Sequence, residues 1–239
     1  MEEWKDRTEK LIGKVALEKL EKAKVIIYGI GGVGSFAVEG LVRAGVGKLV
    51  LVDPDKISAS NINRQIHSNV NTVGKSKIEV MKKRILEINP DADVEIYNPK
   101  ELDFEEQNLI DESFSYVIDA VDTVKTKINI IERAKKVGVP IISAMGAGNK
   151  LECSKFEVAD INKTKICPLA RNIRKELKRR NIKDVKVVYS KEESVVKERT
   201  PASISYVPSV CGLMIAGEVI KDIIKNGEID EGKQSVKNN

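Results

Sequence analysis

Four glycines lie where an apolar segment meets a stretch of helix-compatible composition, in Gly29-Ile30-Gly31-Gly32-Val33-Gly34. The preceding residues, Lys24 to Ile30, are mostly β-branched or apolar, which is typical of a buried parallel strand. Glycine at a strand-to-helix turn permits unusual backbone angles and lets the backbone approach a phosphate. The helix that follows presents free N–H groups and its positive dipole end to an anion. The glycines therefore predict a nucleotide site.

Asp53 strengthens this prediction, because a glycine-rich turn alone is often only structural. It comes nineteen residues after Gly34, at the end of a second apolar segment, Leu49 to Val52. A carboxylate at this place accepts hydrogen bonds from a ribose. The pattern up to Asp53 fits NAD and ATP equally well.

Two cations follow, and they favour ATP. Arg64 lies eleven residues after Asp53, in Ser60-Asn61-Ile62-Asn63-Arg64-Gln65, and Lys77 comes thirteen residues after Arg64. The glycine turn largely suffices for a pyrophosphate, whereas a triphosphate needs more positive charge. Arginine supplies that charge as a bidentate fork, and lysine supplies it as a point charge.

A phosphate loop of the Walker type is missing, although Gly74-Lys75-Ser76 resembles its last residues. Asn69 occupies the position where the first glycine of that loop is required. The glycine turn, Arg64 and Lys77 would then hold the triphosphate. This arrangement suits attack on the α-phosphorus with loss of pyrophosphate.

A second carboxylate, Asp122, follows another apolar strand in Asp119-Ala120-Val121-Asp122-Thr123. Ligands of open α/β sheets bind at the carboxyl ends of such strands. Asp122 is therefore a candidate ligand for Mg²⁺ on the phosphates. Alternatively, it is the N-cap of a helix from Thr123 onward, and the two roles are compatible.

Apolar segments alternate with helical ones, which predicts a Rossmann-like, doubly wound α/β fold with a mostly parallel sheet. The expected strands are 24–30, 49–53, 94–97, 116–120 and 140–144, and the expected helices lie near 34–45, 75–88, 104–111 and 124–137. Residues 155–158 and 185–189 predict further strands, of which the second alternates as a less buried strand does. A helix over 209–225, with Gly212 and Gly217 allowing close approach, completes the domain.

Composition and length bound the class of protein. The 239 residues are 41% hydrophobic and 32% charged, as in a globular protein with one main core. We expect a single domain over 1–226, with N-terminal helices over 1–23, a basic helix and mobile loop inserted over 160–202, and a frayed tail over 227–239. No apolar run approaches the roughly 18 residues of a membrane helix, so a cytoplasmic protein is expected.

Three cysteines, Cys153, Cys167 and Cys211, are spaced too far apart for a C-x-x-C pair. A disulfide framework or a zinc ribbon is therefore not expected. Cys211 lies in an apolar run and fits a core residue. Cys167, before Pro168 in a basic loop, is the one candidate nucleophile, and a structural thiol is the alternative.

The positive charge of the chain is concentrated between Asp160 and Arg199, a segment that contains thirteen Lys/Arg and six Asp/Glu. Within it, Leu169, Ile173 and Leu177 recur at helical spacing, which predicts one buried stripe. The helix would point its cations toward solvent, either as a simple solvated face or as a contact for a polyanion such as RNA. The cations are Arg171, Arg174, Lys175, Lys178, Arg179 and Arg180.

Over residues 24 to about 150, these motifs resemble the E1-like superfamily of adenylating enzymes that includes ThiF, MoeB and HesA. The resemblance implies an enzyme that adenylates a carboxylate with ATP and Mg²⁺. It makes Gly32 a phosphate contact, Asp53 the ribose ligand and Asp122 the magnesium ligand. The remaining nucleotide contacts that it implies are Gly29, Gly31, Gly34, Asp55, Ser60, Asn61, Arg64, Lys77 and Thr123.

Arg7 resembles the arginine with which members of this superfamily reach the ATP of a neighbouring protomer. The resemblance thus implies a homodimer, with Arg7, Arg64, Lys77 and Asp122 in the catalytic machinery. An exposed arginine on an N-terminal helix is the alternative interpretation of Arg7.

Within the superfamily, the chain is most similar to the tRNA threonylcarbamoyladenosine dehydratases. Asn61-Ile62-Asn63-Arg64-Gln65-Ile66-His67, Glu87-Ile88-Asn89-Pro90 and Ser205-Tyr206-Val207-Pro208-Ser209 carry this resemblance. It implies activation of the carboxylate of threonylcarbamoyladenosine at position 37 of tRNA, followed by ring closure through an internal nitrogen and release of AMP. Proximity supplies the rate of that closure, so no enzyme thiol is required.

Other functions remain open from the sequence. One is activation of a small ubiquitin-like sulfur carrier, with a sulfur-relay protein as partner, and another is a non-catalytic or redox Rossmann module. The C-x-x-C pairs of many sulfur-carrier-activating relatives are missing, which favours the tRNA enzyme. His67, the only histidine, fits either a general base near the phosphates or, preferably, a structural hydrogen bond.

Overall fold

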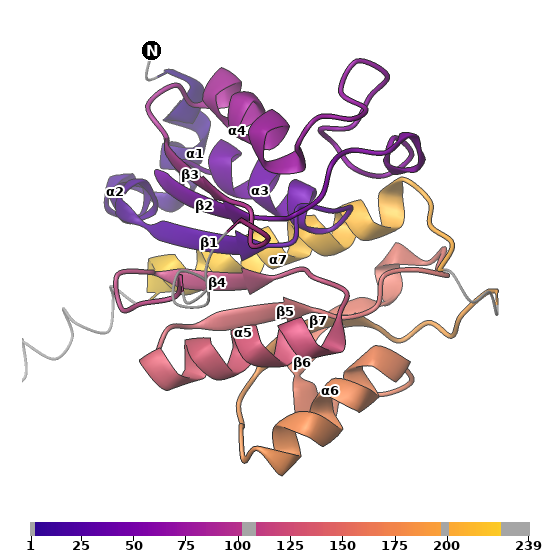
Figure 1. Cartoon of the computed structure of the whole chain (residues 1–239). Helices are drawn as coiled ribbons and strands as arrows, with labels where there is room; N and C mark the ends of the chain where they lie inside the picture. Colours follow the sequence, from indigo (N-terminus) through magenta and orange to yellow (C-terminus); the bar gives the residue numbers. More distant parts are fainter. Residues whose placement is uncertain (1–2, 102–108, 197–200, 226–239) are drawn as a thin grey trace, which may run out of the picture.

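The computed structural model describes residues 3–101, 109–196 and 201–225 (Figure 1). Seven of its strands form one sheet in the order β3-β2-β1-β4-β5-β7-β6. The strands are β1 (Lys24–Tyr28), β2 (Lys48–Val52), β3 (Asp93–Tyr97), β4 (Tyr116–Asp119), β5 (Ile141–Ala144), β6 (Phe156–Asp160) and β7 (Lys186–Ser190). All neighbours pair in parallel except β6 and β7. The predicted doubly wound, mostly parallel α/β fold is confirmed.

Helices cover both faces of the sheet, with α3, α4 and α7 on one side and α5 and α6 on the other (Figure 1). The α-helices are α1 (Asp6–Ile12), α2 (Lys14–Lys22), α3 (Gly34–Arg43), α4 (Lys77–Ile88), α5 (Val124–Val137), α6 (Pro168–Arg179) and α7 (Tyr206–Lys225). Short 3₁₀ helices are η1 (Glu3–Lys5), η2 (Ala59–Asn61), η3 (Cys153–Lys155) and η4 (Ile161–Lys163). None of the helices in the described ranges has the length and apolar content to cross a bilayer.

The central strand β1 supplies both halves of the core. Val25 and Ile27 belong to the cluster under α3, α4 and α7, whereas Ile26 and Tyr28 belong to the cluster under α5 and α6. Successive side chains of a strand point to opposite faces, so a strand covered on both faces must be apolar throughout. This explains why Lys24 to Ile30 shows no alternation.

Strand β7 corrects one expectation. Its residues 187–190 are buried, whereas alternation had predicted a less buried strand. The reason is topological, because β7 lies inside the sheet between β5 and β6, and β6 forms the edge. The basic region over 160–202 thus contributes an internal strand as well as α6. Residues 197–200 of the mobile loop expected in this region lie outside the described residues. The frayed tail expected over 227–239 lies outside them as well.

The boundaries of other elements differ slightly from the prediction. Helix α7 begins at Tyr206 rather than Ser209, because Pro208 fits the first turn of a helix. Residues 109–111 of the helix expected over 104–111 are not helical, and its residues 104–108 lie outside the described part. The helices predicted near 34–45, 75–88 and 124–137 agree with α3, α4 and α5 to within two residues at each end.

Only one of the two glycines in α7 permits close approach. A Cβ on Gly212 would lie 2.2 Å from the carbonyl oxygen of Val33 in the glycine turn. A Cβ on Gly217 would have no atom within 4 Å. Helix α7 therefore contacts the N-terminus of α3 at Gly212, and the close approach expected at Gly217 is absent.

We expect Gly212→Ala to lower the free energy of unfolding by about 1–3 kcal/mol, because the methyl group overlaps backbone that cannot move freely. Gly217→Ala is the matched control in the same helix. It should raise the free energy of unfolding by up to about 1 kcal/mol, since alanine has the higher helix propensity and the space is open. Urea unfolding of both variants measures the difference. Equal effects would contradict the proposed contact.

Candidate active site

The glycine turn joins β1 to α3 with no room for side chains at two positions. Gly29 has φ +87°, and a Cβ there would lie 2.7 Å from the carbonyl oxygen of Ala120. A Cβ on Gly34 would lie 1.8 Å from the carbonyl oxygen of Gly29. The N-cap of α3 is Val33, whose side chain makes no hydrogen bond to the first N–H groups of the helix. The turn can therefore accept an anion.

Asp53 is fixed beside this turn by backbone donors. Its Oδ2 accepts a hydrogen bond from the N–H of Ile30 at 2.6 Å, and its Oδ1 accepts one from the N–H of Asp55 at 2.8 Å. The residue is 5% exposed. Burial raises the pKa of Asp53, and the positive charge of Lys77 opposes that rise. The carboxylate is thus held where the fold places a ribose ligand.

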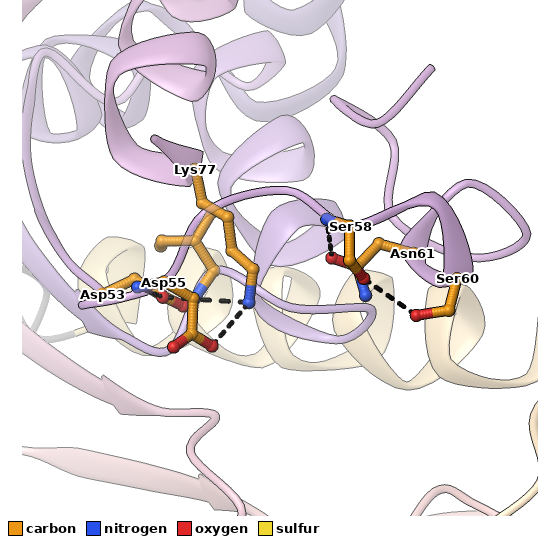
Figure 2. A network of polar contacts seen from close by, with 7 residues as sticks. Asp53, Asp55, Ser58, Ser60, Asn61 and Lys77 are labelled. Atoms are coloured by element: carbon orange, nitrogen blue, oxygen red, sulfur yellow. Dashed lines mark hydrogen bonds and ion pairs between the residues drawn. The ribbon is translucent and has the colours of Figure 1, made fainter. Parts of the chain in front are cut away.

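Lys77 lies against both aspartates, as Figure 2 shows. Its Nζ is 2.9 Å from Oδ2 of Asp55 and 3.8 Å from Oδ1 of Asp53. The side chain is buried at the first residue of α4, whose Ser76 N-cap follows the long loop after β2. The structure therefore brings Lys77 to the turn as predicted. It also shows that Asp55 and Asp53 are its partners, so a phosphate would share Lys77 with them.

The loop around η2 positions Asn61 and Arg64. Oδ1 of Asn61 accepts a hydrogen bond from the N–H of Ser58 at 3.0 Å, and the hydroxyls of Ser58 and Ser60 are 2.8 Å apart (Figure 2). Arg64 donates to the carbonyl oxygen of Ser60 and to Oδ1 of Asn63, both at 2.8 Å. A Cβ on Gly32 would lie 3.3 Å from Cγ of Arg64. The stem of Arg64 therefore lies over the glycine turn.

Asp122 is exposed just past the carboxyl end of β4. Thr123, not Asp122, is the N-cap of α5, and its hydroxyl is 2.9 Å from that of Thr126. The alternative capping role of Asp122 is therefore wrong. Among the described residues no three His, Cys, Asp or Glu side chains are grouped to hold a metal. A magnesium ion at Asp122 would need phosphate oxygens as further ligands, which is the usual way that Mg²⁺ binds.

Buried polar side chains without partners lie next to these residues. Oε1 of Gln65, both ring nitrogens of His67 and Oγ of Ser68 have no hydrogen-bond partner among the described residues. Nε2 of Gln65 is the nearest atom to a Cβ built on Gly31, at 3.9 Å. The amide of Gln65 lies beside the turn and its buried oxygen has no partner in the described structure, so Gln65 is a candidate ligand contact. Gln65 stands in the motif Ser60-Asn61-Ile62-Asn63-Arg64-Gln65, but the motif alone assigns it no role.

Within the described part of the chain, the ring of His67 makes no structural hydrogen bond, contrary to the preferred prediction. The residue is 3% exposed, and burial together with the charges of Lys77 and Arg84 lowers its pKa to about 4. A histidine with so low a pKa stays neutral at pH 7. It is a poor match for a general base, whose pKa should lie near the working pH.

The buried His67 predicts a pH dependence of stability. Its pKa is lower in the folded state than in the unfolded state, so the unfolded chain binds the extra proton between about pH 6.5 and pH 4. Stability therefore falls as the pH drops through this window, by about 3 kcal/mol for this group. His67→Leu should remove that part of the fall, measured by urea unfolding at pH 7 and pH 4. Parallel losses in both proteins would contradict it.

Three other candidates lie elsewhere. Arg7 is exposed on α1, which Figure 1 shows at the side of the sheet away from the loop that follows β2. Cys167 is 4% exposed, and its Sγ accepts a hydrogen bond from the N–H of Ala170 as the N-cap of α6. The thiol therefore has a structural role here. Cys211 is a core residue as predicted, and burial raises its pKa to about 12.

The basic helix α6 differs from the prediction in two residues. Arg174 is half-buried and donates to the carbonyl oxygen and hydroxyl of Thr164, at 2.9 and 2.7 Å. It therefore fixes η4 instead of pointing to solvent. Ala170, rather than the partly buried Leu169, shares the buried stripe with Ile173 and Leu177.

Comparison with known proteins agrees with this geometry. The profile of the ThiF family matches residues 6–239. The chain belongs to the ThiF family. A tRNA threonylcarbamoyladenosine dehydratase of Bacillus subtilis is 39% identical to this ThiF-family chain over 246 residues, covering 95% of the chain and 97% of that protein.

A solved structure shares the fold of this ThiF-family chain. It is the E. coli tRNA N6-threonylcarbamoyladenosine dehydratase TcdA in complex with ATP, with a TM-score of 0.86 and 31% identity, covering 95% of this chain and 96% of that one. An adenylyltransferase and sulfurtransferase, UBA4 of Vanderwaltozyma polyspora, is 36% identical but covers only 57% of the chain and 31% of its own length. The similarity to the dehydratases thus extends over far more of the molecule.

Proposed function

We propose that this ThiF-family protein uses ATP to adenylate the carboxylate of N6-threonylcarbamoyladenosine at position 37 of tRNA and promotes its cyclisation with loss of water. The observation that carries the proposal is the pair of cations at the glycine turn, with Arg64 lying over Gly32 and Lys77 against Asp53. NAD would leave these charges without a role. The near full-length similarity to proteins named as dehydratases supports the choice of substrate.

The chemistry has two steps. A carboxylate oxygen attacks the α-phosphorus of ATP, and the bond to the β-phosphate breaks, so that pyrophosphate leaves. An internal nitrogen of the threonylcarbamoyl group then attacks the activated carbonyl carbon and loses its proton. AMP leaves with one of the former carboxylate oxygens, so the nucleoside becomes lighter by one water.

In this proposal the chain's residues orient and neutralise the triphosphate. Asp53 accepts hydrogen bonds from the ribose, and the N-terminus of α3 faces the phosphates. Asn61, Arg64 and Lys77 contact phosphate oxygens, which stabilises the charge that develops as pyrophosphate leaves. Other proposed nucleotide contacts are neighbours in the sequence: Ser60 precedes Asn61, Asp55 lies two residues after Asp53, and Thr123 follows Asp122. When bound at Asp122, Mg²⁺ would neutralise phosphate charge.

Purified protein, ATP, Mg²⁺ and tRNA carrying threonylcarbamoyladenosine provide the test. We expect AMP, pyrophosphate and a nucleoside with a mass lower by one water, and chelation of Mg²⁺ should stop the reaction. Release of AMP only with a carrier protein that ends in Gly-Gly would overturn the proposal.

The partial similarity to UBA4 favours a second candidate, adenylation of a small ubiquitin-like sulfur carrier with a sulfur-relay protein as partner. A thioester route through Cys167 conflicts with the burial of that thiol. Full activity of Cys167→Ala with such a carrier would exclude the thioester route. Loss of activity with retained stability would support it.

We further propose a homodimer in which Arg7 reaches the nucleotide of the neighbouring protomer. Its exposure on α1, away from its own glycine turn, agrees with a role across an interface. A tRNA substrate would also place the protein in the cytoplasm. Sedimentation that shows only monomers at assay concentrations would exclude the role of Arg7.

A further inference from the structure

A groove of about 940 Å³ lies between helices α5 and α6, which run side by side on one face of the sheet (Figure 1). Its lining comes from both helices. The lining residues are Val124, Lys125, Ile128, Asn172, Lys175, Glu176, Lys178, Arg179 and Arg180. Five cations therefore face one carboxylate, so the groove has a strongly positive potential.

The cations of this groove differ in how they are paired. Arg179 and Arg180 both bind Glu176, and Arg180 also binds Glu132 at 2.6 Å. Three lysines, Lys125, Lys175 and Lys178, make no ion pair within the described part of the chain. These lysines come from both walls of the groove and are therefore free to bind an external anion.

One end of the groove adjoins the candidate active site. Val124 and Lys125 form the first turn of α5, directly after Asp122 and Thr123. Helix α6, with twelve residues, is about 18 Å long and carries the opposite wall. A long ligand bound in the groove would thus extend from the carboxyl end of β4 along these lysines.

No aromatic side chain lines the groove in the described structure, and its apolar lining is limited to Val124 and Ile128. Protein interfaces usually contain aromatic anchors in their centre, and base-specific RNA contacts usually need stacking surfaces. Lysines without such anchors instead suit phosphates, which carry charge and no sequence information. The chemistry of the groove therefore matches a nucleic-acid backbone better than an acidic protein.

We propose that the groove between α5 and α6 binds the phosphate backbone of the substrate RNA through Lys125, Lys175 and Lys178, and leads the modified nucleoside toward Asp122. This inference rests on the proposed function. It changes the surface expected from the basic helix alone, because it adds Lys125 from α5 and removes Arg174, which fixes η4.

The test compares two triple variants with equal loss of charge. Lys125→Gln, Lys175→Gln and Lys178→Gln are combined in one protein. The control combines Lys10→Gln, Lys83→Gln and Lys221→Gln, three exposed lysines on helices that do not line the groove. Affinities for tRNA and for ATP are measured at salt concentrations from about 50 to 200 mM, a range in which phosphate contacts dominate the salt dependence.

We expect the groove variant to bind tRNA about 10-fold or more weakly and to lower the slope of log K against log salt by about 2–3, since each phosphate contact contributes roughly 0.7–0.9. Its affinity for ATP and the behaviour of the control should match the wild-type protein. Equal tRNA slopes in both variants, or loss of ATP binding in the groove variant, would overturn the inference.

The result also separates this inference from the proposed function. Wild-type protein that binds tRNA through the groove lysines but forms no AMP would refute the adenylation and retain the groove. Wild-type protein that binds polyglutamate but no tRNA would refute the groove as an RNA site.

Discussion

Replacing Arg64 with alanine should lower the rate of pyrophosphate release by about 10²–10³-fold, the usual effect of removing one group that stabilises developing charge. Among the described residues, the guanidinium has two acceptors, the carbonyl oxygen of Ser60 and Oδ1 of Asn63. Both belong to its own loop, so the alanine variant should fold normally. A pyrophosphate assay with ATP and modified tRNA measures the loss, and thermal unfolding checks the fold.

Two further variants show whether the geometry of Arg64 matters. Arg64→Lys keeps the charge but loses the bidentate fork, so its rate should lie between those of the wild type and the alanine variant. Arg43→Ala is the control, because Arg43 is exposed on α3 and its ion-pair partner in the described structure is Glu39. If Arg64→Ala were as active as Arg43→Ala, then Arg64 would not contact the phosphates.

Much of the fold could be predicted because its parallel strands are apolar on both faces. Val25 to Tyr28 and Leu49 to Val52 are buried runs. The predicted strands 24–30 and 49–53 begin within one residue of β1 and β2, and they end two residues and one residue beyond them. Strand β7 was misjudged because its neighbours were unknown. Val187 and Tyr189 pack under α5 and α6, and Val188 between them belongs to the other cluster. Alternation cannot reveal that both faces are covered.

The candidate site was predictable as far as spacing reflects position. Asp53, Arg64 and Lys77 come together because the loop after β2 and the start of α4 return to the carboxyl end of β1. The partners of these side chains were not predictable, since they depend on long-range packing. Arg174 turns toward Thr164, and Cys167 is buried as a helix cap, for reasons that only the tertiary structure shows.

A buried ion pair supports the turn that carries Asp122. Nζ of Lys127 lies 3.0 Å from Oδ2 of Asp119, and both side chains are fully buried. The same oxygen of Asp119 accepts a hydrogen bond from the hydroxyl of Ser143 at 2.5 Å, while its other oxygen accepts one from the N–H of Val121 at 3.2 Å. The N–H of Lys127 also donates to the carbonyl oxygen of Thr123. The pair thus ties β4, β5 and α5 together beneath Asp122.

Lys127→Met should therefore lower the free energy of unfolding by about 3–5 kcal/mol, because it leaves the charge of Asp119 buried without its partner. Lys125→Met is the matched control two residues earlier on the exposed side of α5, and it should change stability by no more than about 0.5 kcal/mol. Adding Asp119→Asn to Lys127→Met removes the unpaired charge, so the double variant should be more stable than Lys127→Met alone. Asp119→Asn alone completes the cycle, and urea unfolding of the wild type and the four variants gives the comparison. A double variant that loses the sum of both single effects would show that the two groups do not interact, and the ion pair would then contribute nothing to holding the turn.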